Sequence, residues 1–209
     1  MVKVKVCGIT SFKDALASIA AGADALGFVF FGSSPRFISP LEAQGIVRLI
    51  PKRILRIGVF VNAPVNRVRK IAARCRLDML QLHGEETPAY CRKLKGYKII
   101  KAFRVQKEID VALLRRYPVY AFLFDAFSPS QRGGTGRTFD WGLIRSLRSL
   151  GKPVFLSGGL NARNVRRAIA LVRPRWVDVS SSVESSPGKK DYRKIKAFIR
   201  AAKAKGKKL

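Results

Sequence analysis

The feature that most restricts the fold is a regular alternation of short apolar runs with longer amphipathic segments along the whole chain. Each run is rich in branched and aromatic residues, which is typical of parallel strands covered by helices. Eight such runs predict the strands Val2–Val6, Ala25–Phe30, Leu55–Val61, Met79–Leu82, Lys98–Ala102, Ala121–Phe124, Val154–Leu156 and Trp176–Val179.

Helical patterns separate these strands and follow the last of them. Ser39 before Pro40 and Thr87 before Pro88 mark two helix starts, because each places a capping hydroxyl before a proline at the first helical position. The predicted helices are Phe12–Ala21, Pro40–Ile50, Pro64–Arg74, Pro88–Leu94, Glu108–Arg116, Asp140–Leu150, Asn161–Val172 and Asp191–Ala204.

Eight strand–helix units fit one closed barrel, and 209 residues are close to the smallest length for it. An open doubly wound sheet is the alternative, but no Gly-x-Gly-x-x-Gly follows the first strand. The sequence therefore predicts an α/β protein with one single-domain (β/α)8 barrel, the TIM barrel fold, over residues 1–204. Residues 205–209 are predicted to form a basic C-terminal tail.

The chain carries 42 Lys and Arg residues against 13 Asp and Glu residues, which gives a net charge of +29. Solvated helix faces account for most of these cations, although such a field also attracts anionic molecules and polyanions. No apolar run reaches the ~18 residues of a membrane span, and the N-terminus lacks the apolar core of a signal peptide. Cys7, Cys75 and Cys91 form neither a disulfide framework nor a metal-binding spacing. We therefore expect a reduced, cytoplasmic protein without a metal.

In a barrel of this kind, chemistry takes place where strands end and the following loops begin. The first strand leads to Cys7, the loop after the second contains Arg36, and the fourth leads to Gln81 and His83. The sixth strand leads to Asp125. Taken alone, Cys7 could be a small buried residue and Asp125 a loop cap, so residue type does not decide their roles.

Two stretches, Val154–Asn161 and Val177–Glu184, each begin as a strand and break into small residues. Glycine amides approach a ligand closely, serines add hydroxyl donors, and the N–H groups that open a helix favour an anion. Either loop alone could be an ordinary turn, but together, with Asn161 as a helix N-cap, they predict a phosphate-binding cup after the seventh and eighth strands. Its predicted members are Gly158, Gly159, Ser180, Ser181 and Ser182.

Blocks along the whole chain resemble phosphoribosylanthranilate isomerase, a family of tryptophan biosynthesis, and occur in the family's order. The blocks are Lys5–Thr10, Gly27–Phe30, Ser34–Ser39, Gly58–Asn62, Gln81–Glu85, Gly133–Gly136, Thr138–Trp141, Leu156–Leu160 and Pro187–Asp191. The resemblance implies a (β/α)8 barrel, in agreement with the alternation described above.

The resemblance also implies an Amadori rearrangement, in which the aminoaldose N-(5-phosphoribosyl)anthranilate becomes the aminoketose 1-(2-carboxyphenylamino)-1-deoxyribulose 5-phosphate. Such an enzyme is an intramolecular oxidoreductase that uses general acid and base catalysis and needs no cofactor or metal. By resemblance, Asp125 is the acid that protonates the furanose oxygen, and Cys7 is the base that removes the C2 proton. A thiol has a pKa near ~8.5, so Cys7 requires surroundings, such as nearby cations, that favour its thiolate.

By the same resemblance, Arg36 binds the anthranilate carboxylate, to which a guanidinium offers a bidentate pair. Gln81 and Asp178 are expected to hydrogen-bond the ribulose hydroxyls, with a brace of the barrel rim as the alternative for Asp178. His83 is expected to line the site without an assigned proton role. The glycine-rich loop Ser128–Arg137 is expected to be a mobile cover.

One position departs from the family pattern. The family usually has Ser-Ser-Gly-Val-Glu after the eighth strand, whereas this chain has Ser180-Ser181-Ser182-Val183-Glu184. If glycine serves there for a positive φ or a bare amide, Ser182 weakens phosphate binding unless its hydroxyl compensates.

Two other functions stay open. A related aminoaldose isomerase, from the histidine pathway or with dual substrates, resembles barrels with Asp at both catalytic strand ends, and Cys7 argues against it. A polyanion- or RNA-binding barrel without isomerase activity would account for the charge, but no RNA-recognition signature interleaves aromatic and basic residues. The expected partner is a phosphorylated small molecule, with no membrane and no specific nucleic acid, and with weak non-specific polyanion binding at most. Self-repulsion at +29 favours a monomer over a homodimer.

Overall fold

Eight parallel strands close into a barrel in the order of the chain, each paired with the next and the eighth with the first. This computed structural model describes residues 1–105, 109–126, 141, 143 and 150–204. The strands are β1 (Lys3–Cys7), β2 (Ala25–Val29), β3 (Leu55–Phe60), β4 (Met79–Leu82), β5 (Lys98–Val105), β6 (Ala121–Ala126), β7 (Val154–Leu156) and β8 (Trp176–Val179). The predicted (β/α)8 barrel is confirmed.

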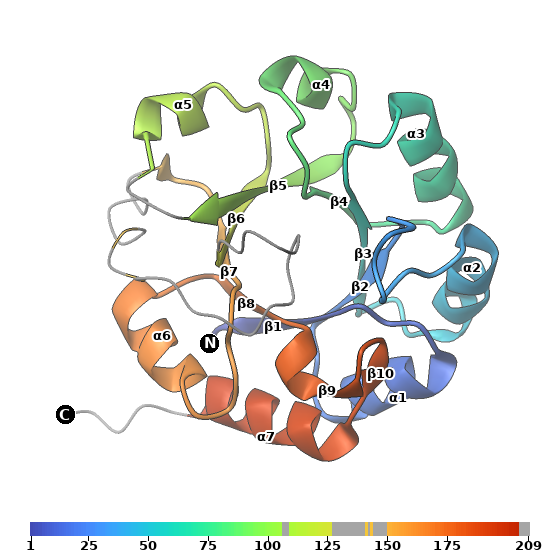
Figure 1. Cartoon of the computed structure of the whole chain (residues 1–209), viewed down its shortest axis with the longest axis vertical. Coiled ribbons are helices and arrows are strands. Elements are labelled where there is room, and N and C mark those ends of the chain that lie inside the picture. The colour runs from blue at the N-terminus through green and yellow to red at the C-terminus, as the bar shows by residue number, and fades with distance from the viewer. Residues whose placement is uncertain (106–108, 127–140, 142, 144–149, 205–209) are drawn as a thin grey trace.

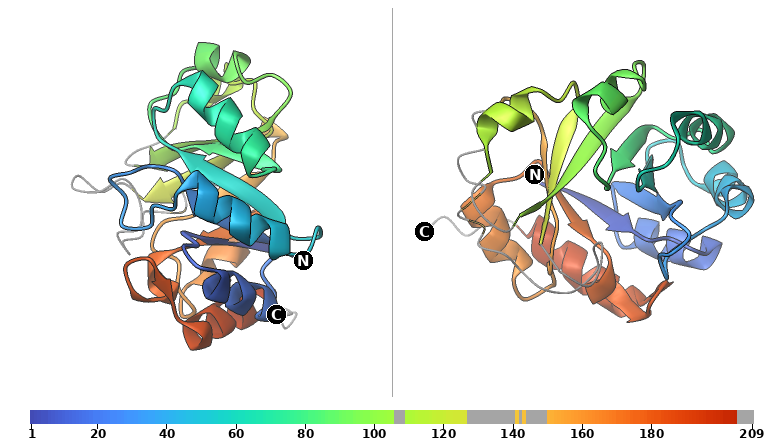
Figure 2. Two further views of the ribbon diagram at one scale, coloured as in Figure 1. Left: turned by 90° about the vertical axis from the view of Figure 1, so that its right-hand side faces the viewer. Right: turned by 45° about the horizontal axis from the view of Figure 1, so that its top comes forward.

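Helices surround this barrel on the outside, as Figure 1 and the two further views of Figure 2 show. In the described part of the chain they are α1 (Phe12–Ala20), α2 (Pro40–Leu49), α3 (Val65–Arg74), α4 (Pro88–Arg92), α5 (Val111–Arg115), α6 (Val165–Val172) and α7 (Tyr192–Lys203). The hydroxyls of Ser39 and Thr87 accept the N–H groups of Glu42 and Tyr90 at the starts of α2 and α4. Both predicted caps are therefore confirmed.

The helix start predicted at Asn161 is wrong, because α6 begins only at Val165. The Asn161 side-chain oxygen accepts the N–H groups of Arg163 and Asn164, at 2.9 and 3.1 Å, and so forms a separate turn before the helix. Asparagine forms such local turns because its short side chain reaches the backbone two or three residues ahead.

Side chains alternate between the inside of the barrel and the layer under the helices. The inner apolar layer consists of Ala25, Ile57, Met79, Ile100, Ala102, Ala121, Leu123, Phe155 and Trp176. Phe155 and Trp176 stack in this layer with ring centroids 5.0 Å apart. An inward-facing residue that follows this layer along its strand lies nearer the carboxyl end of the barrel, where the predicted site residues stand.

A small hairpin covers part of that end. After the 3-10 turn η2 (Ser181–Val183), strands β9 (Glu184–Ser186) and β10 (Lys189–Lys190) pair antiparallel. The hydroxyl of Thr10 donates to the Gly188 carbonyl over 2.6 Å. Gly188 has φ +83°, and a Cβ on it would lie 2.8 Å from the Pro35 carbonyl oxygen. The absent side chain therefore lets the hairpin sit against the loop that carries Arg36.

Three predicted segments lie wholly or largely outside the residues that the structure describes. The cover loop Ser128–Arg137 and the tail at 205–209 lie outside the described residues, as does the helix Asp140–Leu150 except at positions 141, 143 and 150. Within the part that is described, no helix has the length and apolar character that crossing a membrane requires.

Candidate active site

Four predicted site residues lie on the inner face of the barrel near its carboxyl end. Gln81, Asp125 and Asp178 each stand two positions after a member of the inner apolar layer, so strand alternation points them inward as well. Cys7 at the end of β1 packs against Val29 in a separate cluster above that layer. All four side chains are buried. The fold thus brings a thiol, two carboxyl groups and an amide to one mouth.

Lys5 is a polar neighbour of Cys7 on the same strand, and the sequence did not predict it as a site residue. Lys5 faces the same side as Cys7, and its Nζ lies 2.9 Å from Asp178 Oδ1 on the adjacent strand β8. A Cβ on Gly27 would lie 2.7 Å from Cys7 Sγ and 3.1 Å from Lys5 Cε. Gly27 therefore provides the space over β2 that both side chains occupy.

The surroundings of Cys7 act on its ionisation in opposite directions. Burial raises the pKa of the Cys7 thiol, and the Asp178 carboxylate adds to that rise. Lys5 and Lys190 act to lower the pKa, but the balance leaves it above its ordinary value. The expectation that nearby cations favour the thiolate is correct in sign, yet burial outweighs them in the free protein. An added positive charge would be needed to ionise the thiol readily.

The buried pair beside Cys7 is tightly coupled. Burial acts to lower the pKa of Lys5, but the carboxylate of Asp178 and the thiol of Cys7 hold that pKa above its ordinary value. Burial raises the pKa of Asp178, and Lys5 opposes this change. We infer a charged Lys5, because Asp178 compensates the cost of burying an ammonium group.

Asp125 lies next to the only histidine of the chain. His83 Nε2 is 3.4 Å from Asp125 Oδ2, and His83 Nδ1 is 2.9 Å from Gln81 Nε2. With the Gln81 amide in this orientation, Nδ1 accepts a hydrogen bond and the proton of a neutral ring lies on Nε2, toward Asp125. The ring thus lies between Gln81, to which it is hydrogen-bonded, and Asp125, two residues that the sequence predicted separately. Phe122 and Phe124 belong to the outer core and lie on the opposite face of β6.

Arg36 is already engaged by a carboxylate. Its Nε and Nη2 donate to the two oxygens of Glu184 over 2.9 and 2.8 Å, and Lys190 Nζ donates to the same group over 2.7 Å. Burial acts to raise the pKa of Glu184, but Arg36 and Lys190 hold it below its ordinary value. Gly8 lies under this arrangement, since a Cβ on it would stand 2.7 Å from Arg36 Cδ.

The predicted phosphate cup contains two glycines in left-handed conformations, Gly158 with φ +86° and Gly159 with φ +63°. Two of its serine hydroxyls are used within the protein: Ser180 donates to the Cys7 carbonyl over 3.1 Å, and Ser182 donates to the Leu160 carbonyl. Ser182 has no positive φ, so its replacement of the usual glycine brings no backbone strain. A phosphate here would rely on backbone N–H groups more than on these two hydroxyls.

Among the residues that the structure describes, no group of three or more His, Cys, Asp and Glu side chains is arranged to hold a metal ion. Cys7, Cys75 and Cys91 are free thiols and are buried. Burial raises the pKa of Cys91 to about 11 and also raises that of Cys75, so neither outer thiol ionises readily near neutral pH.

The sequence of the chain matches the model of a family described as N-(5'phosphoribosyl)anthranilate (PRA) isomerase over residues 4–201. The chain belongs to the PRA isomerase family. A relative named N-(5'-phosphoribosyl)anthranilate isomerase from Geobacter metallireducens is 50% identical over 204 residues, which cover 98% of this chain and 100% of that protein.

Solved structures of PRA isomerases have the same fold. The enzyme from Thermotoga maritima superposes with a TM-score of 0.91 at 47% identity, with 97% of this chain and 99% of that chain covered. A PRA isomerase in complex with reduced 1-(o-carboxyphenylamino)-1-deoxyribulose 5-phosphate gives a TM-score of 0.88 at 45% identity, with the same coverage. Another structure contains monomers generated from the dimeric Thermotoga maritima enzyme.

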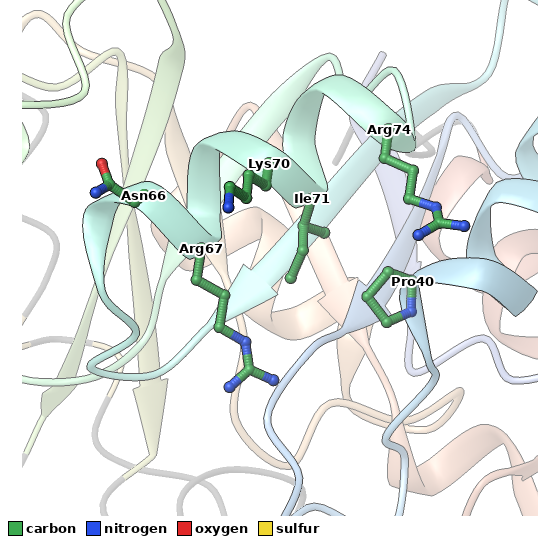
Figure 3. Close-up of a pocket in the computed structure, with 6 residues that line it drawn as sticks. All are labelled: Pro40, Asn66, Arg67, Lys70, Ile71 and Arg74. Carbon is green, nitrogen blue, oxygen red and sulfur yellow. The ribbon is translucent and has the colours of Figure 1, made fainter.

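A hollow on the outside of the barrel lies between α2 and α3 (Figure 3). It has a volume of about 430 Å³ and is lined by Pro40, Asn66, Arg67, Lys70, Ile71 and Arg74. We call it the α2–α3 groove. Its charged lining residues are all cations, and α3 carries no acidic residue.

Proposed function

We propose that this chain isomerises N-(5-phosphoribosyl)anthranilate to 1-(2-carboxyphenylamino)-1-deoxyribulose 5-phosphate, with Asp125 as general acid and Cys7 as general base. The observation that carries the proposal is the placement of a buried thiol and a buried carboxyl group at the same end of one barrel, at the ends of β1 and β6. Family membership supplies the substrate.

The proposed reaction begins when Asp125 protonates the furanose ring oxygen and the bond between that oxygen and C1 breaks. The nitrogen lone pair forms an iminium with C1. Cys7, as its thiolate, then takes the C2 proton, and the electrons of the C2–H bond form the enolamine as the iminium nitrogen becomes neutral. The enolamine gains a proton at C1 and loses the proton of its C2 hydroxyl, which becomes a ketone. The positive iminium acidifies the C2 proton, and because burial raises the pKa of Cys7, the thiolate is a stronger base for that proton once it has formed.

The proposed contacts to the substrate use hydrogen-bond donors that are not already engaged by other groups of the protein. A guanidinium has five N–H donors, and the bonds to Glu184 use two of those on Arg36, so others can meet the anthranilate carboxylate. Gln81 and His83 would line the ribulose chain, and Asp178 would either bind a hydroxyl or act through Lys5. The phosphate would lie against Gly158, Gly159, Ser180, Ser181 and Ser182.

The test is the loss of fluorescence as phosphoribosylanthranilate is consumed by the purified protein. Cys7→Ala and Asp125→Ala should each lower kcat by at least about a hundredfold, because each removes one partner in proton transfer. Circular dichroism should show that both variants fold. Normal turnover by Cys7→Ala would remove the base assignment. Assaying the histidine-pathway aminoaldose in parallel decides whether one substrate or two are accepted.

We further propose one barrel domain over residues 1–204 with a basic tail at 205–209, a cytoplasmic location and a monomeric state. The three cysteines, which form no disulfide in the structure, support the location. The charge of +29 supports the monomer through self-repulsion, although the Thermotoga maritima relative is dimeric. Light scattering at low and high salt tests this: a mass of twice 23.2 kDa in both conditions would overturn the monomer.

The α2–α3 groove favours a second, non-catalytic property, namely weak and sequence-independent binding of RNA. Its cations Arg67, Lys70 and Arg74 are exposed and would contact phosphates along one backbone. The chain offers a matched control, because Arg193, Lys196 and Arg200 on α7 have the same types and the same spacing and are likewise exposed.

The groove variant replaces Arg67, Lys70 and Arg74 by Gln, and the α7 variant replaces Arg193, Lys196 and Arg200 by Gln. Each variant removes three positive charges, so both change the net charge of the protein equally. The groove variant should weaken binding to a single-stranded RNA at least tenfold more than the α7 variant at low salt, and should lower the salt dependence. Equal losses would assign the binding to net charge alone.

A further inference from the structure

Lys5 is an unusual residue for the interior of a barrel. Its side chain is fully buried, and its register partners are the apolar Ala25 on β2 and Asp178 on β8. A buried ion pair is often no more stable than apolar residues of similar volume, because desolvation offsets the attraction. Stability alone therefore does not explain why the pair of Lys5 with Asp178 is buried in the barrel.

The group beside this ion pair is the thiol of Cys7, the proposed catalytic base. Lys5 and Cys7 are two positions apart on β1 and face the same side, and both lie over the Cα of Gly27. An ammonium group has three N–H donors, and Asp178 Oδ1 accepts one of them over 2.9 Å. Lys5 thus has donors that a neighbouring sulfur can accept without breaking the pair.

We propose that Lys5 is a positioning residue for the reaction: it orients Cys7 Sγ and stabilises its thiolate, while Asp178 keeps Lys5 protonated. The inference rests on the proposed function for the role of Cys7 as base. A thiolate formed next to Lys5 gains a direct charge-assisted contact, whereas the neutral thiol gains little. The buried lysine therefore favours the ionised form that the reaction requires.

The other charged groups around Cys7 do not supply this contact in the same way. Lys190 on β10, which is paired with Glu184 over 2.7 Å, also lowers the pKa of the Cys7 thiol, but it acts through its charge alone and less strongly than Lys5, which also hydrogen-bonds the sulfur. Glu184 also binds Arg36, from the loop after β2. His83 after β4 and Asp125 on β6 face Asp178 from across the mouth.

The experiment compares Lys5→Met with Lys101→Met. Lys101 on β5 is the matched control, because it is also buried and its Nζ lies 3.0 Å from the buried carboxylate of Glu86. Each substitution leaves a buried carboxylate without its cation, so both should lose stability. Of these two lysines, only Lys5 adjoins the thiol of Cys7.

The readout is the rate at which iodoacetamide alkylates Cys7 between pH 7 and about 11, followed by peptide mass spectrometry so that Cys75 and Cys91 are counted separately. Lys5→Met should slow alkylation of Cys7 at least tenfold at a fixed pH below the thiol pKa, which corresponds to about one pKa unit. The rising limb of kcat/KM should move to higher pH by the same amount. Lys101→Met should leave both profiles in place.

If Lys5→Met does not fold, the double variant Lys5→Met with Asp178→Leu replaces the pair by apolar side chains and avoids an unpaired carboxylate. It should slow alkylation in the same direction, because Lys5 acts on the Cys7 pKa more strongly than Asp178 does. An unchanged Cys7 titration in either folded variant overturns the proposal. Alkylation needs no substrate, so it tests the role of Lys5 even if the wild-type protein fails to turn over phosphoribosylanthranilate.

Discussion

Gly27→Ala is the sharpest single test of how the fold holds the proposed base. The added methyl carbon would lie 2.7 Å from Cys7 Sγ, 3.1 Å from Cys7 Cα and 3.1 Å from Lys5 Cε. Comfortable contacts between such atoms are roughly 3.5–4.0 Å. Because β1 and β2 are hydrogen-bonded in register at this position, the backbone resists separation and the side chains must move.

The geometry sets the expected magnitudes. The sulfur must shift by about 1 Å to restore an ordinary contact, and an error of that size at a reacting group costs roughly a hundredfold in rate. Overpacking of a tight interior typically costs about 1–3 kcal/mol of stability. We therefore expect Gly27→Ala to fold, to unfold at a lower urea concentration, and to lose about a hundredfold in kcat.

Gly45→Ala is the control for the same chemical change. A Cβ on Gly45 meets nothing within 4 Å, and the residue lies inside α2, away from the barrel mouth. Replacing a helical glycine by alanine should stabilise the protein by about 0.5–1 kcal/mol and leave kcat unchanged. Wild-type kcat in a folded Gly27→Ala protein would refute the reasoning, because the thiol would then tolerate the lost space.

Three further predictions concern the residues around the mouth. Glu184→Gln should destabilise the protein by about 3 kcal/mol at pH 7, because it leaves the buried Lys190 and the half-buried Arg36 without their carboxylate. Since Arg36 and Lys190 hold the pKa of Glu184 below its ordinary 4.5 against the effect of burial, this contribution exists above that pH and is lost as pH falls through the lower folded value. Urea unfolding curves of wild type and variant should therefore converge in acid; a constant gap would contradict the pairing. Arg36→Lys keeps the charge but loses the planar fork, so steady-state kinetics should show KM rising about tenfold with a much smaller change in kcat, and a loss confined to kcat would count against a binding role. Ser182→Gly removes the hydroxyl that donates to Leu160, so thermal unfolding should show a loss of about 1 kcal/mol, whereas a gain would mean that the bond contributes nothing.

The barrel could be predicted from sequence because its signals are local. Strand alternation and the caps at Ser39 and Thr87 depend on residues only a few positions apart, and both are found as expected. The helix start at Asn161 was predicted wrongly because asparagine serves turns and helix caps with the same side-chain oxygen.

The residues missed in the site depend on contacts between distant parts of the chain. Lys5 pairs with Asp178 from the other end of the sequence, and Glu184 binds Arg36 from a different loop. A signal for Lys5 was present, because it lies two positions before Cys7 in the short strand Lys3–Cys7, which makes it inward-facing if Cys7 is. Nothing local marks Glu184 as the partner of Arg36, since the residues are 148 positions apart.

The pairing of β1 with β8 has a consequence for biosynthesis. Lys5 and Cys7 are translated first, whereas the residues that engage them, Asp178 and Ser180, emerge almost at the end. A polypeptide still attached to the ribosome therefore has its proposed sulfur base but not the partners that tune it. Fragments produced by premature termination should be catalytically silent rather than partly active.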